Sequence, residues 1–211
     1  KSYEIVLFTF FAVLIWISSA GYLLAHEIES AECHADPTLN RHHCHSNGQE
    51  VGIPRYERKL FGKWLDLDGD CQNTRHELLI KLSTDTVGFS ENFCRTVSGR
   101  WLGPYSGDIF LESSKLDIDH LVPLKFAWEH GAYSWSKKKR IFFSNDFENL
   151  LAVDKSLNRE KGAYGPTNWL PPNEKYRCHY LLRFQRVMQI YELSFFVMEY
   201  DNFEELKQNY C

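Results

Sequence analysis

The apolar residues divide the chain into a long N-terminal apolar run, a polar stretch and a longer region of short periodic segments. Helical spacing in the last region predicts helices over 74–82, 124–130, 135–143, 176–191 and 202–210. Alternating or short apolar runs predict strands over 93–102 (broken at Ser98-Gly99), 116–122 and 150–153. A short helix is expected over 56–64, and Asp154 and Gly162 delimit a further one. This mixture predicts an α+β fold.

The N-terminal run has the pattern of a targeting segment. Lys1 precedes the apolar residues 5–17, and the small residues Ser18, Ser19 and Ala20 follow, as in a secretory signal with cleavage after Ala20. Read on to Ala25, the run has about 21 mostly apolar residues, enough to span a bilayer. Residues 1–25 are therefore predicted to be a signal peptide or a signal anchor. The protein is expected to be extracellular or periplasmic, or else to be attached to the membrane through this uncleaved segment.

The polar stretch at 26–54 is rich in Cys and His, shows no clear period and is expected to form a loop. The chain's six cysteines all follow the apolar run, and an even number behind a signal sequence suggests disulfides. Proximity along the chain favours the pairs Cys33–Cys44, Cys71–Cys94 and Cys178–Cys211. As thiolates and imidazoles, Cys33, Cys44 and the histidines at 34, 42, 43 and 45 could instead bind zinc or copper. In an oxidising compartment the disulfide is favoured, which leaves only the imidazoles as ligands.

Composition narrows the function only slightly. The 211 residues include 44% hydrophobic and 25% charged residues, which is ordinary for a globular protein and excludes disorder or coiled coil as a description of the whole chain. The 24 basic and 28 acidic residues give a net charge of −4. Because this net charge gives no indication of a surface that is basic overall, binding or cleavage of a nucleic acid would require a local basic site.

The densest group of polar residues that could act in catalysis or bind a metal begins in the predicted strand 116–122. Asp117 and Asp119 share one face of that strand and His120 points to the other, so a metal ligand can lie beside a base. Asn149 precedes the next strand, and Asn158 follows on the helix after it. Carboxylate and amide oxygens with few protein donors suit Mg²⁺ or Mn²⁺ and leave positions for water and phosphate.

The order of these residues resembles the ββα-metal (His-Me finger, HNH) nuclease motif: DxDHxxPL from Asp117, then Asn149-Leu-Leu, then NxxKG from Asn158 to Gly162. The surrounding segments 64–79, 98–107, 127–135, 144–162 and 165–172 resemble the secreted HNH endonuclease family of bacteria and fungi. The resemblance covers about 56–211 and leaves 26–54 without a counterpart. It implies an HNH domain over 55–211, with a ββα-metal core at 116–162 embedded in additional helices and stabilised by disulfides.

The resemblance also implies a role for each matching residue. His120 would be the general base that takes a proton from the attacking water, and Asn149 would orient the segment that carries it. Asp119 and Asn158 would hold one divalent ion, Mg²⁺ or Mn²⁺. Arg159 and Lys161, and more weakly Arg75, would contact substrate phosphates. The expected partner is DNA, with RNA as a second substrate, cleaved with little sequence preference to leave 5′-phosphate and 3′-hydroxyl ends.

Three alternatives stay open at this point. The run Lys137–Arg140 either clamps a nucleic-acid backbone or is a solvated helix face. Asp66, Asp68, Asp70 and Glu77 have the spacing of an EF-hand loop, but Cys71 stands where that loop needs glycine, so a turn and a helix N-terminus are expected instead. The alternative function is that of a membrane-tethered metal-binding protein that uses the His-rich segment and has an inactive nuclease core.

Overall fold

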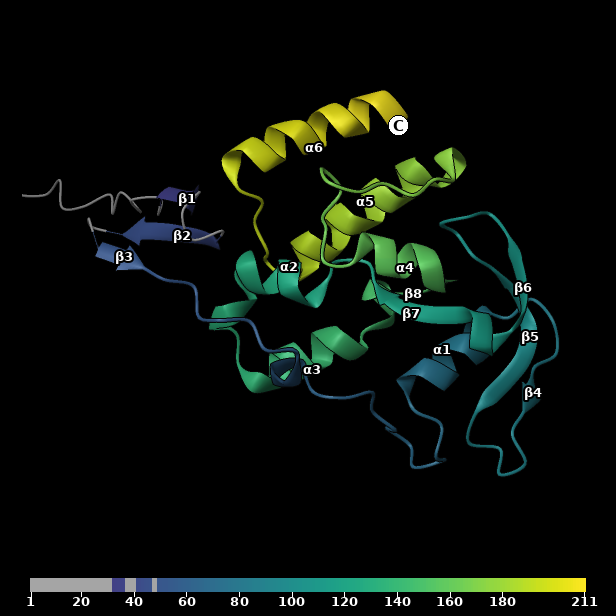
Figure 1. The fold of residues 1–211 in the computed structure, drawn as a ribbon. Helices are drawn as coiled ribbons and strands as arrows, with labels where there is room; N and C mark the ends of the chain where they lie inside the picture. The colour runs from purple at the N-terminus through teal and green to yellow at the C-terminus, as the bar shows by residue number, and fades with distance from the viewer. Residues whose placement is uncertain (1–31, 37–40, 47–48) are drawn as a thin grey trace, which may run out of the picture.

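The structure is a computed structural model that describes residues 32–36, 41–46 and 49–211, and the side chains from 52 onward. The predicted signal segment, residues 1–25, lies outside the described residues. In chain order the elements are β1 (Glu32–Asp36), β2 (Arg41–Ser46), β3 (Gln49–Val51), η1 (Arg58–Phe61), α1 (Thr74–Leu82), β4 (Gly88–Phe89), β5 (Thr96–Leu102), β6 (Ile109–Glu112), η2 (Ser113–Lys115), β7 (Leu116–His120), α2 (Leu124–Glu129), η3 (Ala132–Ser134), α3 (Lys137–Asn145), η4 (Phe147–Asn149), β8 (Leu150–Asp154), α4 (Lys155–Lys161), α5 (Glu174–Ile190) and α6 (Val197–Tyr210) (Figure 1). The fold is α+β, as predicted.

The described parts of the polar stretch include strands, contrary to the loop predicted from the sequence. β1, β2 and β3 form a three-stranded antiparallel sheet in which Cys33 lies opposite Cys44. The sequence of these strands shows no apolar alternation, so hydrophobic periodicity could not predict them. They are defined by backbone pairing between strands. The side chains of Cys33, Cys44 and the neighbouring histidines lie outside the described residues, so the predicted Cys33–Cys44 bond and the metal-binding alternative remain predictions.

A second antiparallel sheet, β4-β5-β6, lies at one end of the molecule, at the right of Figure 1. The strand predicted over 93–102 begins at Thr96 and runs through Ser98-Gly99 without a break. Its register against β6 shifts between Ser98 and Trp101, so the small residues mark an irregularity within the strand. The buried Trp101 ring donates a hydrogen bond from Nε1 to the carbonyl oxygen of Leu79, which ties this sheet to α1.

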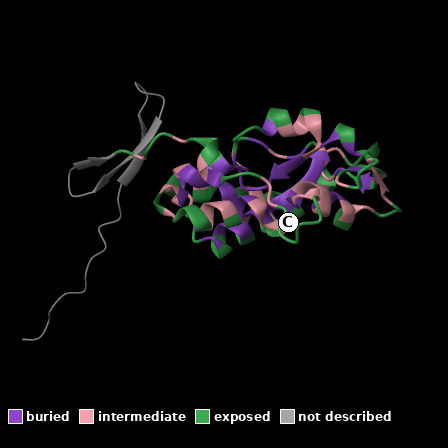
Figure 2. Cartoon of the chain, turned by 90° about the horizontal axis from the view of Figure 1, so that it is seen from below, coloured by how far each residue is buried: buried purple, intermediate pink, exposed green. Residues whose placement is uncertain are grey.

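The central feature of the fold is the antiparallel pair β7-β8, whose two faces meet different apolar clusters. Leu116, Ile118, Leu150 and Ala152 pack with α1 and Trp101 on one face. The residues between them, Leu151 and Val153, face the larger cluster. Figure 2 shows these strands as buried elements between more exposed helices. This burial on both sides holds β7, with its terminal His120, in a fixed position.

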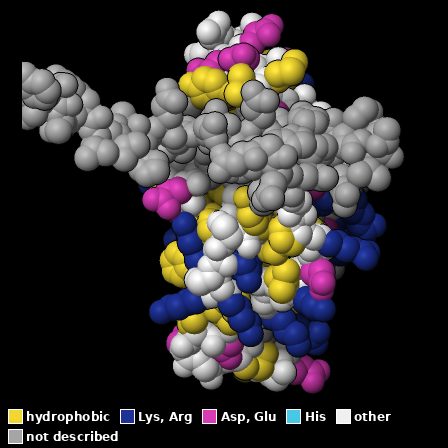
Figure 3. All heavy atoms as spheres, turned by 90° about the vertical axis from the view of Figure 1, so that its left-hand side faces the viewer, with side chains coloured by type: hydrophobic (Ala, Val, Ile, Leu, Met, Phe, Trp, Pro, Cys, Tyr) yellow, Lys and Arg dark blue, Asp and Glu magenta, His cyan; other side chains and the backbone are white. Residues whose placement is uncertain are grey.

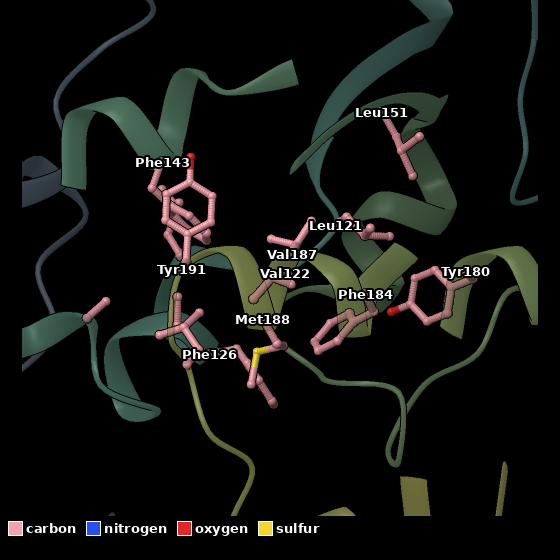
Figure 4. Close-up of a cluster of buried hydrophobic side chains, with 14 of the residues drawn as sticks. Leu121, Val122, Phe126, Phe143, Leu151, Tyr180, Phe184, Val187, Met188 and Tyr191 are labelled. Carbon is pink, nitrogen blue, oxygen red and sulfur yellow. The ribbon is translucent and has the colours of Figure 1, made fainter. Parts of the chain in front are cut away.

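The larger cluster is built mainly from aromatic and aliphatic side chains of α2, α3, α5 and the loops between them. Figure 4 shows its centre, where Phe184, Val187 and Met188 of α5 lie beside Leu121, Val122 and Phe126. The long helix predicted over 176–191 is observed as Glu174–Ile190. The last helix begins at Val197, five residues earlier than predicted.

Two predicted disulfides are confirmed. Cys71–Cys94 joins the loop before α1 to the start of the β5 region, and Cys178–Cys211 joins α5 to the residue after α6. The helix predicted over 56–64 is a single 3₁₀ turn, η1, from Arg58 to Phe61. In the part of the chain that the structure describes, no helix combines the length and apolar character needed to cross a membrane.

Candidate active site

Helix α4 presents its polar residues to one face of β7. The Asp154 carboxylate accepts hydrogen bonds from the backbone N–H groups of Ser156 and Leu157, which starts the helix directly after β8. Gly162 ends it with a φ of +53°, a left-handed conformation that favours glycine. Asn158 and Lys161, one turn apart, therefore meet Asp117 and Asp119, which are two residues apart on the strand. The bonds run from Asn158 Nδ2 to Asp117 Oδ2 (3.2 Å) and from Lys161 Nζ to Asp119 Oδ2 (2.8 Å).

Asp119 is held by two donors from distant parts of the chain. Its Oδ2 accepts hydrogen bonds from Lys161 Nζ and from the Tyr105 hydroxyl at 2.6 Å. Lys161 is 0% exposed, and its ammonium also donates to the His120 carbonyl oxygen at 2.9 Å. Burial raises the pKa of Asp119 and lowers the pKa of Lys161, because desolvation outweighs their mutual attraction. Lys161 thus connects the carboxylate of Asp119, the proposed metal ligand, to the backbone of His120, the proposed base.

His120 lies at the end of β7 with one ring nitrogen engaged and the ring fixed. Nε2 lies 2.9 Å from the carbonyl oxygen of Ser144, which can only accept, so Nε2 carries the proton and Nδ1 keeps its lone pair. The ring stacks on Trp64, with centroids 5.3 Å apart and an interplanar angle of 8°. Burial lowers the pKa of His120 to about 3, so the imidazole is neutral at neutral pH.

Asn149 makes the contacts that an orienting residue would need. Its side chain is fully buried, accepts from the Val122 backbone N–H at 2.8 Å and donates to the Val122 carbonyl at 3.2 Å. Its own carbonyl accepts from the Leu121 N–H. Asn149 thereby fixes the two residues that follow His120 in the chain.

Two neighbouring cavities meet at His120. The first, of about 370 Å³, is lined by Asp119, Asn158, Lys125 and other residues. The second, of about 420 Å³, includes Lys63, Trp64, Asn73 and Ser144 in its lining. Arg58, His120 and Leu124 line both. A substrate in the first cavity would therefore reach the proposed base and the proposed metal ligands together, although these point from opposite faces of β7.

The donors around the first cavity fit a divalent cation. Both hydrogen bonds that the Asp119 carboxylate accepts within the described residues go to Oδ2, which leaves Oδ1. The Asp117 carboxylate can only accept, so the Asn158 amide turns its nitrogen to Asp117 and keeps its oxygen for another partner. One carboxylate oxygen and one amide oxygen beside a water-accessible space are donors that Mg²⁺ or Mn²⁺ accepts.

The structure does not support two of the three expected phosphate contacts. The Lys161 ammonium is buried against Asp119, and the Arg75 guanidinium donates to the carbonyls of Ser113 and Leu116. Through these contacts both cations stabilise the fold around β7. Arg159 is exposed on α4 and remains a candidate.

The run Lys137–Arg140 is also only partly free. Arg140 donates to the carbonyls of Leu60 and Trp135, and Lys139 pairs with Glu192. Four residues of the site were not singled out from the sequence: Arg58, Trp64, Tyr105 and Ser144. The last three lie in segments that carry the family resemblance, but their contacts depend on tertiary packing that no local pattern reveals.

The acidic loop before α1 is an ordered turn. Asp66, Asp68 and Asp70 are exposed, and their oxygens lie within 4.8 Å of one another. Each carboxylate accepts a backbone N–H of the same loop, from Gly69 and Cys71, from Asp70, and from Gln72, respectively. This agrees with the turn expected from the sequence.

The sequence that forms this site matches a known protein family. Residues 77–205 match the family described as "GmrSD restriction endonucleases, C-terminal domain". The chain belongs to this family. It is also 39% identical, over 141 residues, to a protein of Arthroderma benhamiae named "Uncharacterized secreted protein". That alignment covers 66% of this chain and 68% of the fungal protein. No solved structure matches the chain.

The family match covers β7, β8, α4 and every residue named above as a base, an orienting residue or a proposed metal ligand. Membership therefore supports a nuclease-type protein with a nucleic-acid substrate. The name of the fungal relative describes that protein as secreted.

Proposed function

We propose that the chain is a secreted or membrane-tethered HNH-type endonuclease that uses a divalent metal to hydrolyse phosphodiester bonds of DNA, with RNA as a second substrate and with low sequence specificity. The observation that carries the proposal is the convergence of His120, Asp119 and Asn158 on one cavity. The nuclease family match covers all three residues. The order of β7, β8 and α4 supports a ββα-metal core, with α4 packed against β7.

His120 is the proposed general base, and its tautomer follows from its contacts. With Nε2–H donated to Ser144, Nδ1 accepts the proton of the attacking water. The water oxygen forms a bond to phosphorus, and the bond from phosphorus to the 3′ oxygen breaks. The 3′ oxygen leaves with the electron pair and takes a proton from solvent, which gives 5′-phosphate and 3′-hydroxyl ends. The negative charge of a phosphate bound beside the ring favours the protonated imidazole and so raises the proton affinity of His120.

Asp119 Oδ1 and Asn158 Oδ1 are the proposed ligands of the divalent ion. When bound there, the ion would supply positive charge beside the scissile phosphate and its leaving oxygen. The protein's own contribution is to fix these oxygens in advance. Tyr105 and Lys161 hold Asp119, and Asp117 holds the Asn158 amide.

Low sequence specificity follows from chemistry centred on the phosphate. The polar residues that line the first cavity offer charge and oxygen ligands, and the sequence shows no base-reading motif such as a recognition helix. Secretion is consistent with the disulfides Cys71–Cys94 and Cys178–Cys211, which persist in oxidising compartments.

The test is cleavage of supercoiled plasmid and of single-stranded RNA by the purified, oxidised full chain. Each substrate is incubated with Mg²⁺, with Mn²⁺ or with EDTA. Nicking that requires a divalent ion, with 3′-hydroxyl ends that a polymerase can extend, is the expected result. A folded protein that cleaves neither substrate with either metal would contradict the proposal.

A further inference from the structure

We infer that Arg58 contacts the substrate phosphate next to the scissile one, and that the nucleic-acid strand runs from the first cavity to the second across His120. The inference rests on the proposed function and assigns it a binding residue outside the segment that matches the family. It adds a cation at the cavities, whereas Lys161 and Arg75 are bonded to groups of the fold.

The position of Arg58 is the first argument. Arg58 begins the 3₁₀ turn η1 and lines both cavities, as do His120 and Leu124. Of these three shared residues, Arg58 alone carries a permanent charge. Its charge lies close enough to His120 to oppose protonation of that ring. A phosphate bound to Arg58 would therefore be adjacent to the phosphate that His120 and the metal ligands address.

The availability of Arg58 is the second argument. The side chain is exposed, and among the described residues no carboxylate forms an ion pair with it. The preceding and following charges are paired with each other, since Lys59 Nζ lies 2.6 Å from Glu57 Oε2. The guanidinium has the Tyr56 side chain, which also lines the first cavity, as a hydrogen-bond partner. A guanidinium that no carboxylate neutralises can bind a phosphate through two parallel N–H groups, which an ammonium cannot do.

The charge along the two cavities is the third argument. Lys63 lines the second cavity, and Lys125, which pairs with Glu129 at 3.6 Å, lines the first. Among the described residues, Asp119 is the one acidic residue in the lining of the first cavity, and none lines the second. Figure 3 shows Lys and Arg side chains spread over the face where α2 and α3 lie. In a chain with a net charge of −4, the described linings of the two cavities hold more basic than acidic side chains, as a path for a polyanion requires.

The size of the path is consistent with one strand. The two cavities have volumes of about 370 and 420 Å³, and they share lining residues, so neighbouring nucleotides can occupy both. Trp64, which stacks on His120, lines the second cavity together with it.

The test separates binding from cleavage. A short fluorescein-labelled oligodeoxynucleotide of mixed sequence is titrated, in EDTA, with full-length His120→Ala protein, and the anisotropy is followed over a range of NaCl concentrations. The variants are Arg58→Ala, Arg58→Lys and the neighbouring control Lys59→Ala, each in the His120→Ala background. Lys59 is exposed, pairs with Glu57 and lines neither cavity.

Arg58→Ala is expected to weaken binding about five- to tenfold, because it removes one charge-assisted contact at an exposed site. The slope of log K against log salt should fall by about 0.7–0.9, the value for one phosphate contact. Arg58→Lys should keep the slope and lose less affinity, and Lys59→Ala should match the parent protein in both. In the cleavage-competent background, Arg58→Ala should raise KM.

The outcomes distinguish this inference from the proposed function. If the wild-type chain cleaves DNA but Arg58→Ala keeps the parent's affinity and salt slope, the role of Arg58 is refuted and the nuclease assignment stands. If the folded wild-type chain neither binds nor cleaves nucleic acid, the proposed function fails and the inference fails with it.

Discussion

Replacing Lys161 by Met tests whether the ion pair under the site holds it together. Met keeps most of the length of the side chain and removes the ammonium, which is buried and bonded to Asp119 Oδ2 and to the His120 carbonyl. Asp119, itself only 5% exposed, would keep the Tyr105 hydroxyl as its one remaining hydrogen-bond donor within the described residues. The variant therefore leaves a buried carboxylate without its counter-charge.

Removing one partner of a buried ion pair costs about 3–5 kcal/mol of unfolding free energy. For a chain of this length, a loss of that size corresponds to a decrease in Tm of roughly 6–20 °C. Chemical denaturation and thermal scans of the wild type and Lys161→Met measure it. The control is Lys155→Met, the same substitution at the first position of α4, which should change stability by less than about 1 kcal/mol.

A second variant identifies the cause of the loss. In Lys161→Met/Asp119→Asn the unpaired charge is gone, so the double variant should be more stable than Lys161→Met alone. A loss below about 1 kcal/mol in Lys161→Met, or no recovery in the double variant, would refute the reasoning that the ammonium compensates a buried carboxylate.

Four further predictions follow from single contacts. Asn149→Ala leaves the Val122 N–H and C=O unpaired in a buried place, so urea denaturation should show a loss of roughly 1–3 kcal/mol for each group. Asp154→Ala removes the N-cap of α4 and should cost about 1 kcal/mol at neutral pH. Because folding lowers the pKa of Asp154, that difference should be fully present above the ordinary value of 3.8 and disappear as the pH falls below it, which denaturation at a series of pH values checks. Cys178→Ser/Cys211→Ser should lower the unfolding free energy by about 2–4 kcal/mol, and a reducing agent should then have less effect on the variant than on the wild type. Asn158→Ala should reduce the thermal stabilisation produced by Mn²⁺, whereas Lys155→Ala should not; equal stabilisation of all three proteins would remove Asn158 from the ligand set.

The sequence predicts the elements of the site well where the signal is local. The helix Thr74–Leu82 is observed with the predicted bounds, because Asn73 caps it and its apolar residues recur at helical spacing. Asp154 and Gly162 likewise mark the limits of α4. The alternation that predicts β7 also places Asp117 and Asp119 on one face, and the structure brings α4 to that face.

What the sequence does not predict depends on contacts between distant residues. Lys161 and Arg159 look alike in the sequence, but only packing against β7 buries Lys161, 42 residues away from Asp119. Tyr105 reaches the same carboxylate from a Gly-Pro turn that predicts only a change of direction. Strands β1–β3 lack apolar alternation, and β6 is a short segment whose role is set by pairing with β5.

The most direct test of the central claim is the single-turnover cleavage rate of the wild type and His120→Ala on the same DNA with Mg²⁺. His179→Ala serves as the control, since His179 is exposed on α5 and lines neither cavity that meets at His120. With His120 as general base, His120→Ala should lose about 10²–10⁴-fold in rate while His179→Ala keeps the wild-type rate. Folded His120→Ala protein that cleaves at the wild-type rate would contradict the account.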